Sequence, residues 1–285
     1  MKNKNLENKI LENKNLENKN LKYALVTGAS SGLGELFALK LAEENWNLIL
    51  VARSEDKLKS LAFSLSNKFS IKVETISLDL SEQNSASKLF AIIQSKSSLA
   101  SNIELVINNA GIGIVKYFDQ SDANELTQMM NLNMITPTLL SLYFIKHMKE
   151  NNISGTILNL SSMAAFNPIP KMSCYAATKS FILSLSMAID YELRELEADL
   201  KIKVLTLCPG PAETNFFNRA NYSSKKILMK VQSAEEVVST GMKAIKNKTS
   251  VSIVGTSNKI LVFISKFFPS NLINKMTSYF MGYNR

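Results

Sequence analysis

The sequence predicts an α/β protein with a doubly wound, parallel sheet of seven strands. Two observations support this prediction: short apolar runs alternate with helical segments from Leu21 onward, and a glycine-rich turn follows the first apolar run. Strands that alternate with helices at this spacing form right-handed βαβ units with helices on both faces of the sheet. The chain has 285 residues, of which 46% are hydrophobic, so it can build one substantial core.

The expected elements follow one another at regular intervals. Apolar runs predict strands over residues 23–27, 48–51, 72–76, 105–108, 156–160, 204–207 and 251–254. Helical periodicity predicts helices over residues 34–44, 55–68, 129–145 and 234–246.

We divide the chain into three parts. Residues 1–20 repeat the pattern Leu-Glu-Asn-Lys every fifth residue, which turns each leucine about 140° from the last and forms no apolar stripe. We therefore expect a disordered, low-complexity tail, which also lacks the apolar core of a signal peptide. Residues 21–255 form the globular domain, and residues 256–285 form a basic, apolar C-terminal extension in which no apolar run is long enough to cross a bilayer.

Composition excludes several classes of function. The net charge is +9, but the lysines are spread along the chain without a recognition motif, so we expect no nucleic-acid binding. Two cysteines, Cys174 and Cys208, are too few for a disulfide framework and indicate a reducing cytoplasm. His147 is the only histidine, and we interpret it as a helix-surface residue. Clustered His or Cys ligands are absent from the sequence, so we expect no metal site.

A glycine-rich turn follows the first expected strand. Gly28, Gly32 and Gly34 permit a tight turn, let the backbone approach a pyrophosphate, and open a helix whose amides attract phosphate. Their spacing is G-x-x-x-G-x-G rather than the G-x-G-x-x-G fingerprint. A purely structural turn is the alternative. The positions that we expect to bind a dinucleotide here are Gly28, Ser30, Ser31, Gly32, Leu33 and Gly34.

The next two strand ends carry charged residues. In the Rossmann fold, an acid about 20 residues beyond the glycine loop binds the ribose 2′-hydroxyl of NAD, whereas an arginine suits the 2′-phosphate of NADP. Arg53 lies at this distance beyond Gly34, which favours NADP over NAD; a solvated arginine at the sheet edge is the alternative. Asp79, followed by Leu80, is placed to accept a hydrogen bond from adenine, unless Ser81 begins a helix there as its N-cap.

Compact polar residues follow the fourth strand. Residues 108–111 read Asn-Asn-Ala-Gly and lie at the carboxyl edge of the sheet, where ligands of such folds bind. We expect Asn109, Ala110 and Gly111 to contact the cofactor. Asn133 lies in a helical run, where it is either a kink that holds a water near the active site or an ordinary polar residue.

A tyrosine and a lysine stand one helical turn apart further along the chain. Tyr175 and Lys179 are i and i+4, so a helix presents both on one face. A free tyrosine titrates near ~10 and needs a shift of about three units to exchange protons at neutral pH, of which one nearby cation supplies roughly 1–3. The positive charge of an oxidised nicotinamide would supply the rest. Ser162 follows an apolar strand upstream. The alternative is a surface Tyr and Lys on an amphipathic helix.

With these residues in order, the chain resembles the short-chain dehydrogenase/reductase family over roughly residues 22–255. The matching positions are residues 27–34, Asp79, residues 108–111, Asn133, Ser162, Tyr175, Lys179, Pro209, Gly210 and Thr214. Residues 51–54 and 164–184 are most similar to the branch that contains hydroxysteroid dehydrogenases and ketoacyl-CoA reductases.

The resemblance implies a role for each of four residues. Tyr175 would be the general acid that protonates a carbonyl oxygen as hydride arrives from the nicotinamide. Ser162 would hydrogen-bond the same oxygen, and Lys179 would hold the ribose hydroxyls and lower the pKa of Tyr175. Asn133 would position a water for proton relay.

The resemblance also assigns residues to the nicotinamide carboxamide, namely Pro209, Gly210 and Thr214. The glycine loop departs from the family pattern, because NADP-binding members often have a basic residue where this chain has Ser30 and Ser31. Cofactor choice therefore depends mainly on Arg53.

The last third of the chain suggests the kind of substrate. Phe216 and Phe217 lie in a polar, irregular segment that would cover an apolar ligand, unless both are core residues of a short helix. No acidic residue follows Glu236. We expect the basic, apolar extension either to pack as a helix or at a subunit interface, or to lie on an anionic membrane surface, with disorder as the remaining alternative.

Together these features predict an NADP(H)-dependent oxidoreductase that reduces a lipophilic ketone or aldehyde. We expect a homo-oligomer, a dimer or tetramer, in the cytoplasm or at a membrane surface. An NAD-dependent alcohol dehydrogenase of the same fold and a non-catalytic dinucleotide-binding regulator are the alternatives.

Overall fold

The structure, a computed structural model, describes residues 22–196, 201–214, 216, 220, 222, 228 and 230–283. The low-complexity stretch 1–20 and Phe217 lie outside these residues. The described residues form one parallel sheet of seven strands in the order β3-β2-β1-β4-β5-β6-β7. The strands are β1 Tyr23–Thr27, β2 Asn47–Ala52, β3 Val73–Ser77, β4 Ile103–Asn108, β5 Thr156–Leu160, β6 Lys203–Cys208 and β7 Val251–Ile253. Every expected strand is present.

The chain reverses its direction of travel across the sheet beside β1. After β3 it crosses back over β1 and β2 to place β4 on the other side of β1, with Tyr23 opposite Asn47 on one side and Ile103 on the other. Ligands of open α/β sheets bind at such a reversal, outside the carboxyl ends of the strands. The fold therefore directs attention to the loops after β1 and β4.

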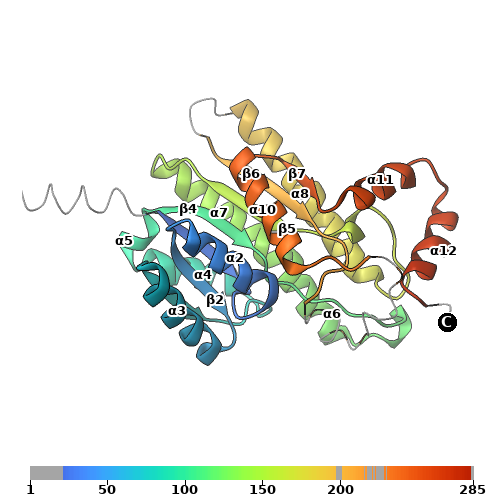
Figure 1. Ribbon diagram of the computed structural model, residues 1–285, viewed down its shortest axis with the longest axis horizontal. Helices are drawn as coiled ribbons and strands as arrows, with labels where there is room; N and C mark the ends of the chain where they lie inside the picture. Colours follow the sequence, from blue (N-terminus) through green and yellow to red (C-terminus); the bar gives the residue numbers. More distant parts are fainter. Residues whose placement is uncertain are drawn as a thin grey trace, which may run out of the picture.

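Helices cover both faces of the sheet (Figure 1). One face packs against α2 Gly32–Glu43, α3 Glu55–Phe69 and α10 Ala234–Asn247; the other packs against α4 Ser85–Gln94, α7 Thr136–Glu150 and α8 Ser173–Leu196. Strand residues alternate between the two cores, so Leu25 contributes to one and Val26 to the other. Such strands read as continuous apolar runs because both of their faces are buried.

The helix expected over 129–145 is interrupted. The helix α6 Ala123–Met130 ends in a π-helical segment, η2 Asn131–Ile135, before α7 begins at Thr136. Pro137 directly follows this segment, and because it has no N–H it cannot make the regular α-helical hydrogen bond to the preceding turn. The interruption places Asn133 in the π-helical segment, which agrees with a kink rather than a regular helix.

The interpretation of His147 as a surface residue is wrong. It is buried, because its side of α7 packs against α4 and the short helix α5 Ser97–Ala100. Its Nε2 donates to the carbonyl of Ala100 at 2.8 Å, and its Nδ1 accepts from the Gln94 amide at 2.9 Å. The histidine is thus a hydrogen-bonded core residue far from the loops after β1 and β4.

The C-terminal extension folds into α11 Thr256–Ser265 and α12 Ser270–Phe280. Figure 1 shows both, in red, at the end of the molecule opposite α3 and α5. Two side-chain hydrogen bonds attach them to the loop before α8: Asn167 donates to Ser265 at 3.1 Å, and Thr277 donates to the Pro168 carbonyl at 3.2 Å. Within the described ranges, no helix combines the length and apolar character needed to cross a membrane.

Candidate active site

The backbone of the glycine loop after β1 is in close contact with the backbone at the start of α2. Gly28 and Gly32 have φ of +67° and +61°, which disfavours any side chain. A Cβ on Gly34 would lie 2.3 Å from the carbonyl oxygen of Gly28, so the first turn of α2 packs directly on the loop. The start of α2 therefore points its backbone amides at the space beyond β1, an arrangement that favours phosphate.

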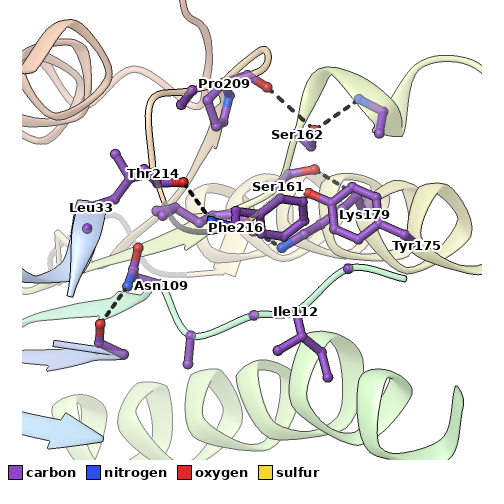
Figure 2. A pocket seen from close by; sticks show the side chains of 18 of the residues that line it. Leu33, Asn109, Ile112, Ser161, Ser162, Tyr175, Lys179, Pro209, Thr214 and Phe216 are labelled. Carbon is purple, nitrogen blue, oxygen red and sulfur yellow. Dashed lines mark hydrogen bonds between the residues drawn. The ribbon is translucent and has the colours of Figure 1, made fainter. Parts of the chain in front are cut away.

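A cavity of about 400 Å³ extends from this loop along the carboxyl edge of the sheet. Of the predicted site residues, all except Gly34 and Asn133 line it: Gly28, Ser30, Ser31, Gly32, Leu33, Arg53, Asp79, Leu80, Asn109, Ala110, Gly111, Ser162, Tyr175, Lys179, Pro209, Gly210 and Thr214. Figure 2 shows Ser162, Tyr175 and Lys179 grouped on one side, with Leu33 and Asn109 on the other. Residues far apart in sequence thus form one elongated site.

Thr27 fixes the turn after β4, a role that the sequence analysis did not assign. Its buried hydroxyl accepts from the backbone N–H groups of Asn109 and Ala110, both at 3.0 Å. The Asn109 amide in turn donates to the Thr27 carbonyl at 2.9 Å. A hydroxyl at the end of a buried strand was the available signal. These bonds join the two loops on either side of the strand-order reversal.

Arg53 and Asp79 form an ion pair at one end of the cavity, the end where we expect the adenosine part of a dinucleotide. Arg53 Nη1 lies 3.6 Å from Asp79 Oδ2, while 67% of the arginine side chain remains exposed. Asp79 also accepts from the N–H and hydroxyl of Ser81, at 2.9 and 2.7 Å. Burial pushes the pKa of Asp79 upward, but the Ser81 hydrogen bonds and the Arg53 charge outweigh it, and the net direction is down.

The alternative in which Ser81 caps a helix is wrong. The helix α4 begins at Ser85, and its N-cap position is Asn84. Leu80 and Ser81 instead form a turn before this helix. The Leu80 carbonyl in this turn accepts hydrogen bonds from the hydroxyls of Ser85 and Thr136, at 3.0 and 2.8 Å.

The helix α8 and the end of β5 bring the polar trio together. Tyr175 and Lys179 lie on the buried side of the first two turns of α8, and the tyrosine hydroxyl and Ser162 share a hydrogen bond. Ser162 follows β5, where its hydroxyl accepts from Ala164 N–H at 3.1 Å and donates to the Pro209 carbonyl at 3.4 Å. Pro209 follows the neighbouring strand β6, so the sheet itself sets the position of Ser162.

Burial dominates the electrostatics of the trio. It raises the pKa of Tyr175 to about 12, against the smaller opposite effect of the Ser162 hydrogen bond. It lowers the pKa of Lys179 to about 8. Lys179 Nζ donates to the Leu160 carbonyl at 2.8 Å and stands 5.8 Å from the centroid of the Tyr175 ring. The role expected of Lys179, to lower the pKa of Tyr175, stays a prediction, because the causes that act on the tyrosine here are its burial and the Ser162 hydrogen bond.

Asn133 does not line the cavity, but its side chain hydrogen-bonds the loop after β4. Its Oδ1 accepts from Ile112 N–H at 3.0 Å, and its Nδ2 donates to the Ile112 carbonyl at 2.8 Å and to Thr178 at 3.2 Å. Its Oδ1 would lie 3.2 Å, and Lys179 Nζ 3.4 Å, from a Cβ on Gly111. Asn133 thus connects the loop to α8 at the residue that directly precedes Lys179.

Gln232 supports the turn after β6, and the sequence analysis missed it. The buried side chain accepts from Gly210 N–H at 2.8 Å and donates to the Val254 carbonyl at 2.9 Å. It joins the ends of β6 and β7 beneath the residues expected to hold the nicotinamide. Nothing in the surrounding irregular segment signals this role.

Phe216 lies inside the cavity, against Tyr175. Its ring centroid lies 5.3 Å from that of Tyr175, and Figure 2 shows the ring between Tyr175 and the glycine-loop side. This contact fits both expectations for Phe216, a ligand-covering residue and a core residue of a short helix, so its role stays a prediction. Further apolar lining comes from Ile169, Met172, Leu261, Phe280 and Met281.

These features fit a nicotinamide dinucleotide. The glycines leave room where a side chain would collide, the α2 terminus faces the expected pyrophosphate, and a basic residue stands at the ribose end. A metal site has no equivalent support, since the described residues contain no group of three His, Cys, Asp or Glu side chains placed to hold an ion.

The fold and cavity define a dinucleotide-binding α/β oxidoreductase, and comparison with known proteins identifies the family. The short chain dehydrogenase family model matches residues 22–225. This chain therefore belongs to the short-chain dehydrogenase/reductase family, whose oxidoreductases act on carbonyl and alcohol groups, as the resemblance implied.

Three similar proteins illustrate the relationship. Benzil reductase ((S)-benzoin forming) of Bacillus cereus is 29% identical over 208 residues, 72% of this chain and 81% of that protein. The very-long-chain 3-oxoacyl-CoA reductase of Bos taurus is 30% identical over 61% of this chain, which spans about half (55%) of its length. A short-chain dehydrogenase from Sphingobium yanoikuyae, solved in complex with NADPH, has a TM-score of 0.74 at 29% identity and covers 82% of this chain and 87% of its own.

Proposed function

We propose that this protein reduces a lipophilic ketone or aldehyde to an alcohol with NADPH, with Tyr175 as the general acid. The observation that carries the proposal is the convergence of Ser162, Tyr175 and Lys179 at one end of the cavity, while the glycine loop and Arg53 line the other. Names of similar proteins support the direction, since both the Bacillus cereus and the Bos taurus relatives are reductases.

The roles follow from the position and chemistry of each side chain. Bound NADPH supplies the hydride. The Tyr175 hydroxyl donates its proton to the carbonyl oxygen, and the Ser162 hydroxyl donates a hydrogen bond to the same atom. Lys179 holds the ribose hydroxyls and keeps a positive charge beside the tyrosine. Because Tyr175 and Lys179 are buried and Ser162 is partly buried, these interactions are stronger than they would be in water.

Apolar lining supports a lipophilic substrate. Phe216 lies against Tyr175, and residues of α11, α12 and the loop before α8 extend the apolar wall from there. Small-molecule pockets of this kind use a few polar groups for orientation and apolar contact for affinity. We place the enzyme in the cytoplasm, where its two free cysteines, Cys174 and Cys208, would stay reduced.

Replacing Tyr175 by Phe tests the catalytic assignment. We expect kcat to fall by about 10²–10⁴-fold, the usual contribution of a general acid, while NADPH affinity changes little because the ring remains. Absorbance of NADPH during turnover of a carbonyl panel, with fluorescence titration for binding, measures both. Tyr191→Phe, an exposed tyrosine on the same helix, is the matched control. Full activity in the Tyr175 variant would contradict the proposal.

Arg53 supports NADP as the cofactor. It lies at the carboxyl end of β2 within the cavity, and the Sphingobium yanoikuyae structure contains NADPH. We expect Arg53→Ala to weaken NADPH binding by about 10–100-fold, as for loss of one charge-assisted hydrogen bond of 1.5–3 kcal/mol. Binding of NADH should change little. Equal losses for the two cofactors, or a native preference for NADH, would favour the NAD-dependent alternative.

A further inference from the structure

The C-terminal helices expose a set of large apolar side chains. The C-terminal patch consists of Ile260, Phe263, Ile264, Phe267, Phe268, Leu272 and Tyr279, every one of which is exposed. Phe263 and Phe267 are 63% and 72% exposed, with ring centroids 5.3 Å apart. A contiguous apolar surface of this kind on a folded protein marks a place where something binds.

Helical spacing puts the patch on one side of α11. Positions 260, 263 and 264 follow the i, i+3, i+4 pattern, which gathers them on one face, and Phe267 in the turn after α11 packs against Phe263. The opposite face is occupied within the protein, since Asn258 and Val262 are buried and Leu261 lines the cavity. In α12, Ile273 is buried and Phe280 lines the cavity, while Leu272 and Tyr279 are exposed. Both helices therefore have an inner side that packs within the protein and an outer side that exposes apolar residues.

The charge around the patch is of one sign. Lys259, Lys266 and Lys275 are exposed on the same two helices and the turn between them. The sequence contains no acidic residue after Glu236. Apolar side chains flanked by lysines match the interface of a bilayer that carries anionic headgroups, where the lysines meet phosphate and the rings enter the acyl boundary.

This charge argues against a second copy of the chain as the occupant. A symmetric pair joined through the patch would bring the same three lysines of both copies together, because an isologous interface contacts itself. Like charges held in an apolar contact oppose association. An anionic membrane presents negative headgroups to the lysines, so this repulsion does not arise.

We propose that the outer faces of α11 and α12 bind the surface of an anionic lipid bilayer. The same helices line the cavity with Leu261, Thr277 and Phe280, so docking holds the cavity next to the lipid phase. The attachment is peripheral, since two short helices cannot span a bilayer. The proposal does not depend on which carbonyl compound the enzyme reduces.

Vesicle sedimentation of the full chain tests the proposal. We expect binding to phosphatidylcholine vesicles that contain one third phosphatidylglycerol, weaker binding in high salt, and little binding to phosphatidylcholine alone. The double variant Phe263→Glu, Phe267→Glu should lower the partition coefficient by at least about 100-fold, because each buried ring contributes roughly 1.5–3 kcal/mol. Phe63→Glu, an equally exposed phenylalanine on α3, should bind as the unmodified chain does.

Charge-reversal variants distinguish an effect of the lysines near the patch from an effect of the protein's net charge. Lys259→Glu, Lys266→Glu and Lys275→Glu together should weaken binding about 100-fold, since each lysine near the surface contributes about 1 kcal/mol. The same reversal at Lys57, Lys88 and Lys146, exposed on α3, α4 and α7, changes the net charge equally and should have a much smaller effect. Equal losses for the two triple variants would overturn the proposal.

Depth of insertion provides a measurement that folding defects cannot imitate. In a Trp46→Phe background, Phe263→Trp adds a single indole to the patch, and Phe63→Trp adds one to the control position. Brominated lipids should quench only the first. Absence of quenching would overturn the proposal, as would failure of the unmodified chain to bind vesicles. If sedimentation velocity then showed that the double phenylalanine variant converts an oligomer to a monomer, the patch would be a subunit contact instead.

Discussion

Lys179 is an amine enclosed by protein, with its Nζ on the Leu160 carbonyl. Burial brings the pKa down from 10.5 to about 8, so the charged form is held in the native state at a free-energy cost. In the unfolded chain the same amine keeps its proton up to about pH 10.4. Between pH 8 and about pH 10 the unfolded state therefore binds more protons than the native state, and stability contributed by this residue rises with pH.

Lys179→Met isolates this effect. Relative to the variant, the unmodified protein should gain roughly 1 kcal/mol of unfolding free energy per pH unit between pH 8 and 10, and the difference should be constant below pH 7. Urea denaturation at a series of pH values measures it. Parallel curves for the two proteins over the whole range would show that the native amine keeps its ordinary pKa.

At this scale the sequence predicted the residues with reactive groups better than those that position them. Tyr175 and Lys179 are visible because helical spacing is fixed, and Ser162 because it ends an apolar strand. Gln232 and Thr27 could not be found in the same way, since their hydrogen-bond partners lie in distant strands and loops. The pKa of Tyr175 was also out of reach, because desolvation depends on packing that the sequence does not express.

The start of α2 is the element on which we propose that cofactor binding depends. The helix packs so closely on the glycine loop that a methyl group at Gly34 would lie 2.3 Å from the Gly28 carbonyl oxygen. Backbone, unlike a long side chain, has little freedom to move away. The loop and the helix therefore behave as one unit.

Gly34→Ala should push the start of α2 away from the glycine loop. We expect a loss of about 1–3 kcal/mol in the free energy of unfolding from overpacking, together with much weaker NADPH binding because the helix amides shift. Thermal denaturation and cofactor titration measure the two effects. Glu35→Ala, an exposed neighbour on α2, is the control and should alter neither by much. Unchanged cofactor affinity in the Gly34 variant would mean that the loop does not hold the pyrophosphate.

The order of helices and strands could be predicted well from periodicity, with one instructive failure. Residues 129–145 read as one helix because their apolar pattern is continuous, yet the chain inserts the π-helical segment Asn131–Ile135. The cause lies outside the helix: Asn133 hydrogen-bonds Ile112 in the loop after β4 and Thr178 in α8. Local periodicity cannot anticipate bonds to two separate elements. π-Helical segments of this kind often mark functional sites.

On the scale of the whole molecule, cofactor binding should stabilise the fold, because the site is assembled from loops across the sheet. With NADPH at 100 times its dissociation constant, the gain is about 2.7 kcal/mol, or a rise in Tm of roughly 5–10 °C for a protein of this size. Differential scanning fluorimetry measures the shift, with NADH at the same concentration as the comparison. We expect the NADPH shift to be larger. No shift with either cofactor would contradict dinucleotide binding.

The central position of β1 has a consequence for synthesis on the ribosome. Tyr23–Thr27 emerges first, but one of its two neighbours is β4, which is made only after β2 and β3. A nascent chain that ends before Ile103 thus leaves an unpaired strand edge in the middle of the future sheet. Such edges promote intermolecular association. We therefore expect the nascent chain to be prone to association until β4 has been made.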